Sequence, residues 1–231
     1  MNNYSSLDVN KSIAINTFIS KVYGWMALAL ALTGITAFYV SSTPSISQAV
    51  FSNQFLFWGL IIGELILVFV ISGAINRISS QTATLLFLLY SVINGITLSF
   101  IFIVYTKTSI ATTFFITAGT FAIMSVYGFV TKKDLTKLGA LLFMVLIGVV
   151  IAALVNIFLK SSTLQWIITI VGIIVFVGLI AYDTQKIKQI GDSAIDSQMK
   201  KKLSIIGALS LYLDFINLFL LLLQLFGGRR N

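Results

Sequence analysis

Seven long apolar segments dominate the 231-residue chain and leave little sequence outside them. A helix that crosses the hydrocarbon core of a bilayer needs about 20 apolar residues, at a rise of about 1.5 Å per residue. The segments have close to this length and cover residues 22–40, 53–75, 82–105, 109–130, 138–159, 164–183 and 203–226. They predict an all-α integral membrane protein with seven transmembrane helices.

The composition agrees with this prediction and excludes several kinds of site. Hydrophobic residues make up 58% of the chain and charged residues 10%, whereas soluble domains average about 25% charged residues. The chain has no cysteine and no histidine, which excludes disulfides, thiol chemistry, haem and the usual zinc or copper sites. We therefore expect no cofactor, and any proton chemistry must use the seven acidic residues.

The basic residues lie between the apolar segments, where they indicate topology and not nucleic-acid binding. With a cytoplasmic N-terminus, most of them fall inside: Lys11, Lys21, Arg77, Lys132, Lys133, Lys137, Lys186, Lys188, Lys200, Lys201 and Lys202. Outside are Lys107, Lys160, Arg229 and Arg230. We therefore predict a cytoplasmic segment at 1–21, a transmembrane domain at 22–226 and an external tail at 227–231. The tail arginines leave a re-entrant last hairpin as an alternative. The polar residues 184–202 are expected to form the longest loop.

Asp214 lies near the middle of the last apolar segment, where an ionised acid costs at least about 2.5–3.5 kcal/mol. It belongs to a stripe with helical spacing that consists of Gly207, Ser210, Asp214, Asn217, Leu221 and Gln224. Small and polar side chains in a membrane helix face protein or water and not lipid. The stripe therefore predicts that the last helix is central in the bundle. The structural alternative is a packing seam in which Asp214 is protonated and hydrogen-bonded.

Two further acids lie in apolar segments. Asp183 ends the sixth segment, where it can reach interfacial water or pair with Lys186. Glu64 lies within the second segment, after Gly59 and Gly63, whose spacing predicts close helix packing. Arg77 lies about 20 Å from Glu64 along the axis of that helix, so the two cannot pair without a large bend. For both acids, a functional role and a structural one are open. Three amides and hydroxyls are expected to form packing hydrogen bonds: Asn94, Thr97 and Asn156.

Asp183 and Asp214 come from consecutive segments, and tilt or a water-filled crevice would bring them together. Two nearby carboxyl groups in a low-dielectric site would share one proton. When that proton is lost, two carboxylates about 4 Å apart at a dielectric of about 20 repel each other by about 4 kcal/mol. This energy is close to the roughly 5.5 kcal/mol that shifts a two-state equilibrium from 1:99 to 99:1. We hypothesise a proton latch between the last two helices, and the exposed oxygens would suit Ca²⁺.

Five stretches of the chain resemble the bacterial branch of the Bax inhibitor-1 family, also called the transmembrane Bax inhibitor motif family. They are KVYGWMALALALTG, NGITLSFIF, TKKDLTKLG, AYDTQKIK and LSLYLDFINLFLLLLQLFG. The resemblance runs from about residue 18 to the C-terminus, and the last two stretches are long and specific.

This resemblance implies seven helices with the last one central, in a bacterial inner membrane. It also implies a pH-sensitive calcium leak in which Asp183 and Asp214 are the sensor and hold Ca²⁺ transiently. Glu64 and Arg77 resemble an acid and a base of the family's second helix, although the spacing is loose; with Ser210 and Asn217 they are candidates for the ion pathway. The implied partners are the lipid bilayer, calcium ions and a membrane protease or other membrane protein. A link to animal cell death need not extend to bacteria.

Two other functions are weighed against the calcium leak. Intramembrane aspartyl proteases also place aspartates in successive spans, but they usually carry GxGD at the second acid and a later motif with proline. Here the second acid follows Leu-Tyr-Leu, and the single proline is Pro44 in the first external loop, so we expect no enzymatic activity. A non-conducting regulator that binds another membrane complex is the second alternative.

Overall fold

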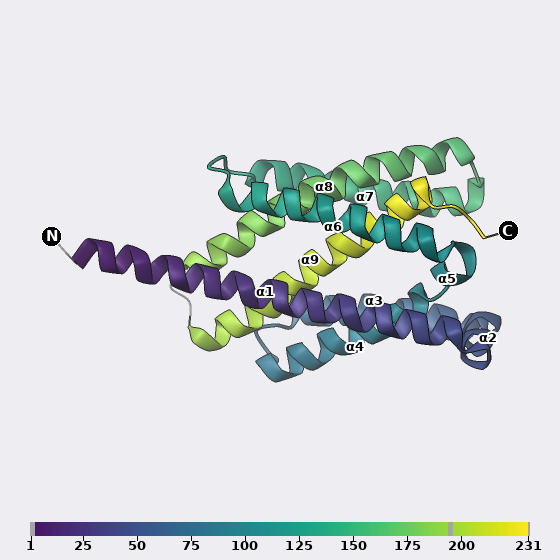
Figure 1. The fold of residues 1–231 in the computed structure, drawn as a ribbon, viewed down its shortest axis with the longest axis horizontal. Coiled ribbons are helices and arrows are strands. Elements are labelled where there is room, and N and C mark those ends of the chain that lie inside the picture. Colours follow the sequence, from purple (N-terminus) through teal and green to yellow (C-terminus); the bar gives the residue numbers. More distant parts are fainter. Residues whose placement is uncertain (1–2, 194–195, 231) are drawn as a thin grey trace. The chain divides into compact units, whose positions relative to one another are not determined.

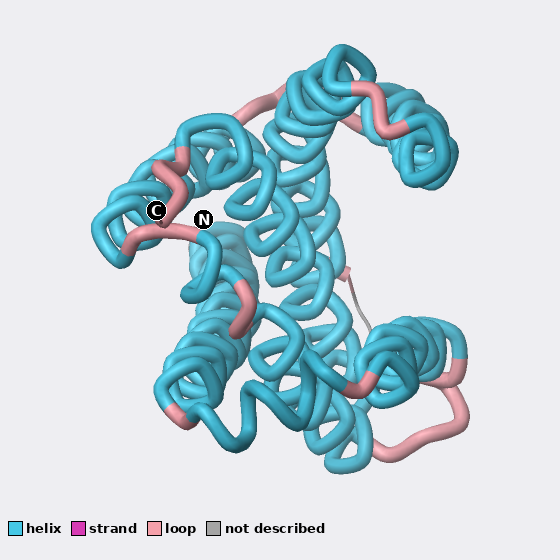
Figure 2. Tube along the Cα trace, turned by 90° about the vertical axis from the view of Figure 1, so that its right-hand side faces the viewer, coloured by secondary structure: helices cyan, strands magenta, loops and turns pink. Residues whose placement is uncertain are grey.

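The structure is a computed structural model that describes residues 3–193 and 196–230, with only the backbone described for residues 3–11. Within these ranges the chain folds into helices joined by short connections (Figures 1 and 2). The helices are α1 (Asn3–Ser42), α2 (Pro44–Ser52), α3 (Gln54–Gly73), α4 (Ser80–Leu98), α5 (Ile101–Val104), α6 (Lys107–Val130), α7 (Thr136–Leu159), α8 (Ser162–Asp192) and α9 (Ser197–Phe226).

The predicted seven crossings are confirmed. Seven helical segments are long and apolar enough to span a bilayer, with α5 continuing the crossing of α4 and with α2 as a short connection. The crossings differ in burial: 67% of the most apolar window of α9 is buried, against 6% for α3. The last helix therefore contributes mainly to the interior, whereas α3 presents most of its surface outward.

The predicted loop at 184–202 is wrong for most of its length. Helix α8 continues to Asp192, and α9 begins at Ser197. Lysine, glutamine and isoleucine in this segment favour a helix, and the buried Ile187 extends the apolar face of α8 past the end of the membrane run. Polarity therefore marked the end of the apolar segment correctly, but not the end of the helix.

The chain forms two compact units, each with its own interior. Unit 1 contains residues 1–104 and 189–212, and unit 2 contains residues 105–188 and 213–231. Each unit includes part of α9, whose colour runs from green to yellow in Figure 1.

In unit 1, α4 packs against both α1 and α3. Gly95 of α4 permits a close approach to α1, because a Cβ there would lie 2.7 Å from the Thr33 carbonyl oxygen. The close packing predicted at Gly59 and Gly63 is wrong: a Cβ at either position would meet no atom within 4 Å. Gly59 is exposed and Gly63 is half-buried, so spacing alone did not identify the face that packs.

In unit 2, α6 packs against α8 and the C-terminal part of α9. The ring of Phe215 on α9 lies between Phe114 and Phe121 of α6, at centroid distances of 5.5 and 5.6 Å. At the other end of α6, Gly128 faces the backbone of Ala181 in α8 so closely that a Cβ would overlap it. These contacts fix α8 against α6 just before Asp183, and α9 against α6 just after Asp214.

Candidate functional site

Asp214 lies in the part of α9 that belongs to unit 2, and its side chain is 5% exposed. Its Oδ2 atom is buried and has no hydrogen-bond partner among the described residues. Buried polar atoms in folded proteins are nearly always paired, so an unpaired carboxyl oxygen needs an explanation. The packing-seam alternative requires a protonated, hydrogen-bonded Asp214. The residues that the structure describes form no such bond with Oδ2.

Asp183 lies in α8, in the same unit, and is 9% exposed. The expected pairing with Lys186 is absent: no salt bridge between Asp183 and Lys186 occurs among the described residues. The Lys186 ammonium instead lies over the Tyr182 ring, 6.0 Å from its centroid. Asp183 is therefore a buried acid that no cation of the described side chains contacts.

Asp183 and Asp214 are both buried, and both belong to unit 2. No described hydrogen bond joins the two carboxyl groups directly. A second polar atom of unit 2 is also buried: Ser125 Oγ of α6 has no hydrogen-bond partner within the described part of the chain. Ser125 lies one turn from Phe121, and Asp214 is next to Phe215, which Phe121 contacts. Unit 2 thus contains two unpaired polar atoms on helices that pack together, in addition to Asp183.

Helix α8 is fixed around Asp183 from both directions along its axis. Two residues earlier, Ala181 packs on Gly128 of α6. Two residues later, Gln185 binds the connection between α6 and α7: its Oε1 accepts from Leu135 N at 2.8 Å, and its Nε2 donates to Lys133 O at 2.8 Å. The backbone that carries Asp183 is therefore held in place before and after the acid.

Glu64 belongs to a separate polar network in unit 1. Asn94 Nδ2 donates to Glu64 Oε2 at 3.1 Å, and Thr97 Oγ1 donates to Glu64 Oε1 at 2.7 Å. This confirms the prediction of packing hydrogen bonds at Asn94 and Thr97, and it identifies Glu64 as their partner. Asn156 is confirmed in the same role, because its Nδ2 donates to Gln165 Oε1 of α8 at 3.0 Å.

The Glu64 network continues to α9 and α1 through a tyrosine that sequence reasoning missed. Tyr212 is fully buried, and its hydroxyl donates to Asn94 Oδ1 at 3.0 Å and lies 2.6 Å from Thr33 Oγ1. Thr33 Oγ1 also donates to Ser91 O at 2.8 Å. Two hydroxyl hydrogens thus serve three contacts, so the network has alternative proton arrangements. The sequence signals for Tyr212 were its place two residues before Asp214 and its position in the stretch LSLYLDFINLFLLLLQLFG.

The remaining candidates for the ion pathway are not brought into one cluster. Arg77 is exposed in the turn after α3, and no described hydrogen bond or salt bridge joins it to Glu64. Asn217 donates to Leu213 O of its own helix at 2.8 Å, and Ser210 is half-buried one turn before Asp214. Glu64, Arg77 and Ser210 belong to unit 1, whereas Asn217 belongs to unit 2 with the aspartate pair.

Comparison with known proteins places this arrangement in a family. A sequence model of the family described as "Inhibitor of apoptosis-promoting Bax1" matches residues 15–231. The chain is 51% identical over 224 residues to "Inner membrane protein YbhL" of Escherichia coli (strain K12), and the match covers 96% of each chain. The chain belongs to the Bax inhibitor-1 family. The resemblance read from the five sequence stretches is thereby confirmed.

Other relatives of this Bax inhibitor-1 family member are similar over nearly their whole length. An uncharacterized protein of Borreliella burgdorferi is 49% identical over 218 residues, with 94% of each chain covered. An uncharacterized protein of Deinococcus radiodurans is 40% identical over 215 residues, which cover 93% of this chain and 92% of that one. Family membership and seven apolar helices together establish a multi-pass membrane protein.

Replacement of Tyr212 by phenylalanine tests the unit 1 network. We expect Tyr212→Phe to lower the free energy of unfolding by about 1 kcal/mol, because it removes one hydroxyl that bonds Asn94 and Thr33 inside the membrane region. Unfolding in an SDS titration would measure the change. Tyr127→Phe is the control, since Tyr127 is 43% exposed. Equal stability of the two variants would contradict a structural role for the network.

Proposed function

We propose that this protein is a pH-sensitive calcium leak in which Asp183 and Asp214 form the proton sensor. The observation that carries the proposal is the unpaired, buried Oδ2 of Asp214, which lies in the same unit as the buried Asp183. Ionisable groups inside a membrane protein are costly and usually functional. The resemblance to the Bax inhibitor-1 family suggests the ion, and the burial of both acids in one unit supports the sensor.

The proposed mechanism rests on the number of protons held by the pair. With one shared proton, the two carboxyl groups carry a single negative charge and hold α8 and α9 together. When the pH rises and this proton leaves, two like charges repel each other in a low-dielectric interior. The helices then separate, and the carboxylate oxygens become ligands that suit a hard cation such as Ca²⁺. Calcium is the transported ion here, and the proposal assigns no catalytic residue and no cofactor.

The proposed orientation places the N-terminus in the cytoplasm of a bacterial cell. Eleven of the fifteen basic residues then lie on the inner side. The name of the Escherichia coli relative, an inner membrane protein, supports the same membrane for this chain. In this orientation α8 ends on the inner side, so Asp183 would respond to cytoplasmic acidity. The rest of the ion pathway remains a prediction, with four candidate residues: Glu64, Arg77, Ser210 and Asn217.

Calcium flux into liposomes tests the sensor. We expect wild-type flux to rise as the pH is raised through the range in which the pair loses its shared proton. Asp183→Asn and Asp214→Asn should flatten this dependence, because an amide has nearly the same shape but no titrating proton. Asp214→Asn should fold as well as the wild type, since Oδ2 makes no hydrogen bond that the change would remove.

Ser125→Ala is the matched control for flux. It removes the other unpaired buried oxygen of unit 2 without changing a charge, so the pH dependence should persist. If both asparagine variants retain the wild-type rate and pH profile, the sensor is not this pair. A folded wild-type protein with no flux at any pH would favour a non-conducting regulator that binds another membrane complex.

A further inference from the structure

Three lysines line one pocket in unit 1, at the start of two membrane crossings. The pocket has a volume of about 300 Å³ and lies between α1 and the first turns of α9. Its lysines are Lys21 of α1 and Lys200 and Lys201 of α9. None of its described lining residues is acidic, so three positive charges surround one cavity without a carboxylate among them. We call this cavity the basic pocket.

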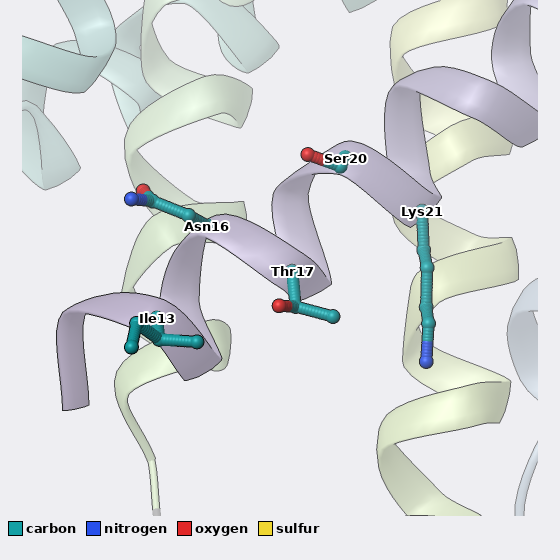
Figure 3. A pocket seen from close by; sticks show the side chains of 5 residues that line it. All are labelled: Ile13, Asn16, Thr17, Ser20 and Lys21. Carbon is teal, nitrogen blue, oxygen red and sulfur yellow. The ribbon is translucent and has the colours of Figure 1, made fainter. Parts of the chain in front are cut away.

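Hydroxyl groups complete the lining of the basic pocket. Thr17 and Ser197 add two hydroxyl groups that can donate hydrogen bonds, and Phe18 and Ala14 add an apolar part. The Ser204 hydroxyl already donates to Lys201 O at 2.7 Å. Figure 3 shows the neighbouring part of α1, where the side chains of Thr17 and Lys21 extend to the same side of the helix; a second pocket there shares both residues. Ammonium and hydroxyl donors around one cavity are the chemistry that holds a phosphate group.

The charges of the basic pocket are not neutralised by the nearby acid at the start of α9. Asp196 caps this helix, and its Oδ2 accepts from Gln198 N at 3.0 Å and from Met199 N at 3.3 Å. In the described part of the chain no salt bridge involves Lys21, Lys200 or Lys201. Lys200 Nζ donates to the Gly191 carbonyl at 3.1 Å, which fixes this side chain without cancelling its charge.

The level of the basic pocket relative to the apolar runs indicates which source of phosphate it could bind. Lys21 directly precedes the apolar run that starts at Val22, and Lys200 and Lys201 precede the run that starts at Leu203. Lysines at such boundaries lie at the level of the lipid headgroups. Beyond Lys21, the exposed Leu28 and Ile35 of α1 offer an apolar surface for an acyl chain. Basic pockets between transmembrane helices on the cytoplasmic side are typical sites for anionic headgroups.

We propose that the basic pocket binds the phosphate headgroup of an anionic phospholipid on the inner leaflet. The lysines neutralise the phosphodiester, the hydroxyl groups of Thr17 and Ser197 hydrogen-bond its oxygens, and one acyl chain lies along α1. This site is separate from the aspartate pair, which belongs to the other unit. Its existence does not depend on calcium transport.

Fluorescence quenching of Trp25, one turn after Lys21, tests the proposal in the full-length protein. A Trp58→Phe, Trp166→Phe background leaves Trp25 as the single tryptophan, and both replaced residues are exposed. The probes are vesicles that contain brominated phosphatidylglycerol or brominated phosphatidylcholine. We expect phosphatidylglycerol to bind about 10-fold more tightly next to Trp25, and K21Q/K200Q/K201Q to reduce this preference to less than about 2-fold.

K132Q/K133Q/K137Q is the matched control, because it removes the same charge from three exposed lysines outside the basic pocket. It should keep the preference. K21Q/K201Q leaves the Lys200–Gly191 hydrogen bond intact and tests the site if the triple variant does not fold. An equal loss in the control, or no lipid preference in the wild type, would overturn the proposal. Loss of the preference on addition of millimolar inorganic phosphate would assign the pocket to a soluble phosphate instead.

Discussion

Gly128→Ala is expected to destabilise the protein by about 3 kcal/mol or more. A Cβ at residue 128 would overlap the carbonyl group of Ala181 in α8, which is backbone and cannot rotate away as a flexible side chain would. Overpacking a core typically costs about 1–3 kcal/mol, and a clash between two helix backbones belongs at the upper end. To accept the methyl group, α6 and α8 would have to move apart.

Gly148→Ala is the matched control for this variant. Gly148 also lies within a membrane-spanning helix of unit 2, and a Cβ there would meet no atom within 4 Å. Alanine favours a helix over glycine by about 1 kcal/mol, so this control should be as stable as the wild type or more stable. Unfolding in an SDS titration would compare the two variants, and similar stabilities would contradict the close contact of α6 and α8.

The Gly128→Ala variant also tests whether this helix packing affects the proposed sensor. Ala181 lies two residues before Asp183, so a displacement of α8 at Ala181 would also move the acid. Calcium flux through refolded Gly128→Ala should therefore depend less steeply on pH than flux through the wild type. The Gly148→Ala control should retain the wild-type profile, because α7 at that position faces outward.

The sequence was sufficient to predict features that the bilayer dictates locally. A crossing needs a minimum length of apolar helix, so the seven spans could be read directly. The acid in the middle of the last span could not face lipid at an acceptable cost, so the burial of Asp214 was predictable as well. Both conclusions depend only on neighbours along the chain.

Features that depend on distant partners could not be predicted in this way. The Glu64 network joins α3 to Asn94 and Thr97 and reaches Tyr212, which is 118 residues after Asn94. No local pattern encodes which helix faces a given side of α3, and the Gly59–Gly63 spacing pointed to the wrong face. The end of α8 was missed because helix propensity continues through the polar residues that leave the membrane.

Gln185→Leu is the second variant for which we expect a large effect, a loss of about 2–4 kcal/mol. Gln185 is buried, and it binds two backbone groups of the connection between α6 and α7. Leucine would leave the buried Leu135 N–H and the partly buried Lys133 C=O without these partners, and an unpaired buried group costs about 1–3 kcal/mol. Gln224→Leu, at an exposed position on α9, is the control and should change stability little.

Gln185→Glu separates the two hydrogen bonds. A glutamate oxygen can still accept from Leu135 N–H, but an ionised carboxylate has no hydrogen to donate to Lys133 O. Its loss of stability should therefore lie between those of the wild type and Gln185→Leu, and hydrogen exchange at the Leu135 amide should accelerate only in the leucine variant. If the leucine variant leaves that amide protected, the connection is held by other contacts, and Gln185 does not fix α8 next to Asp183.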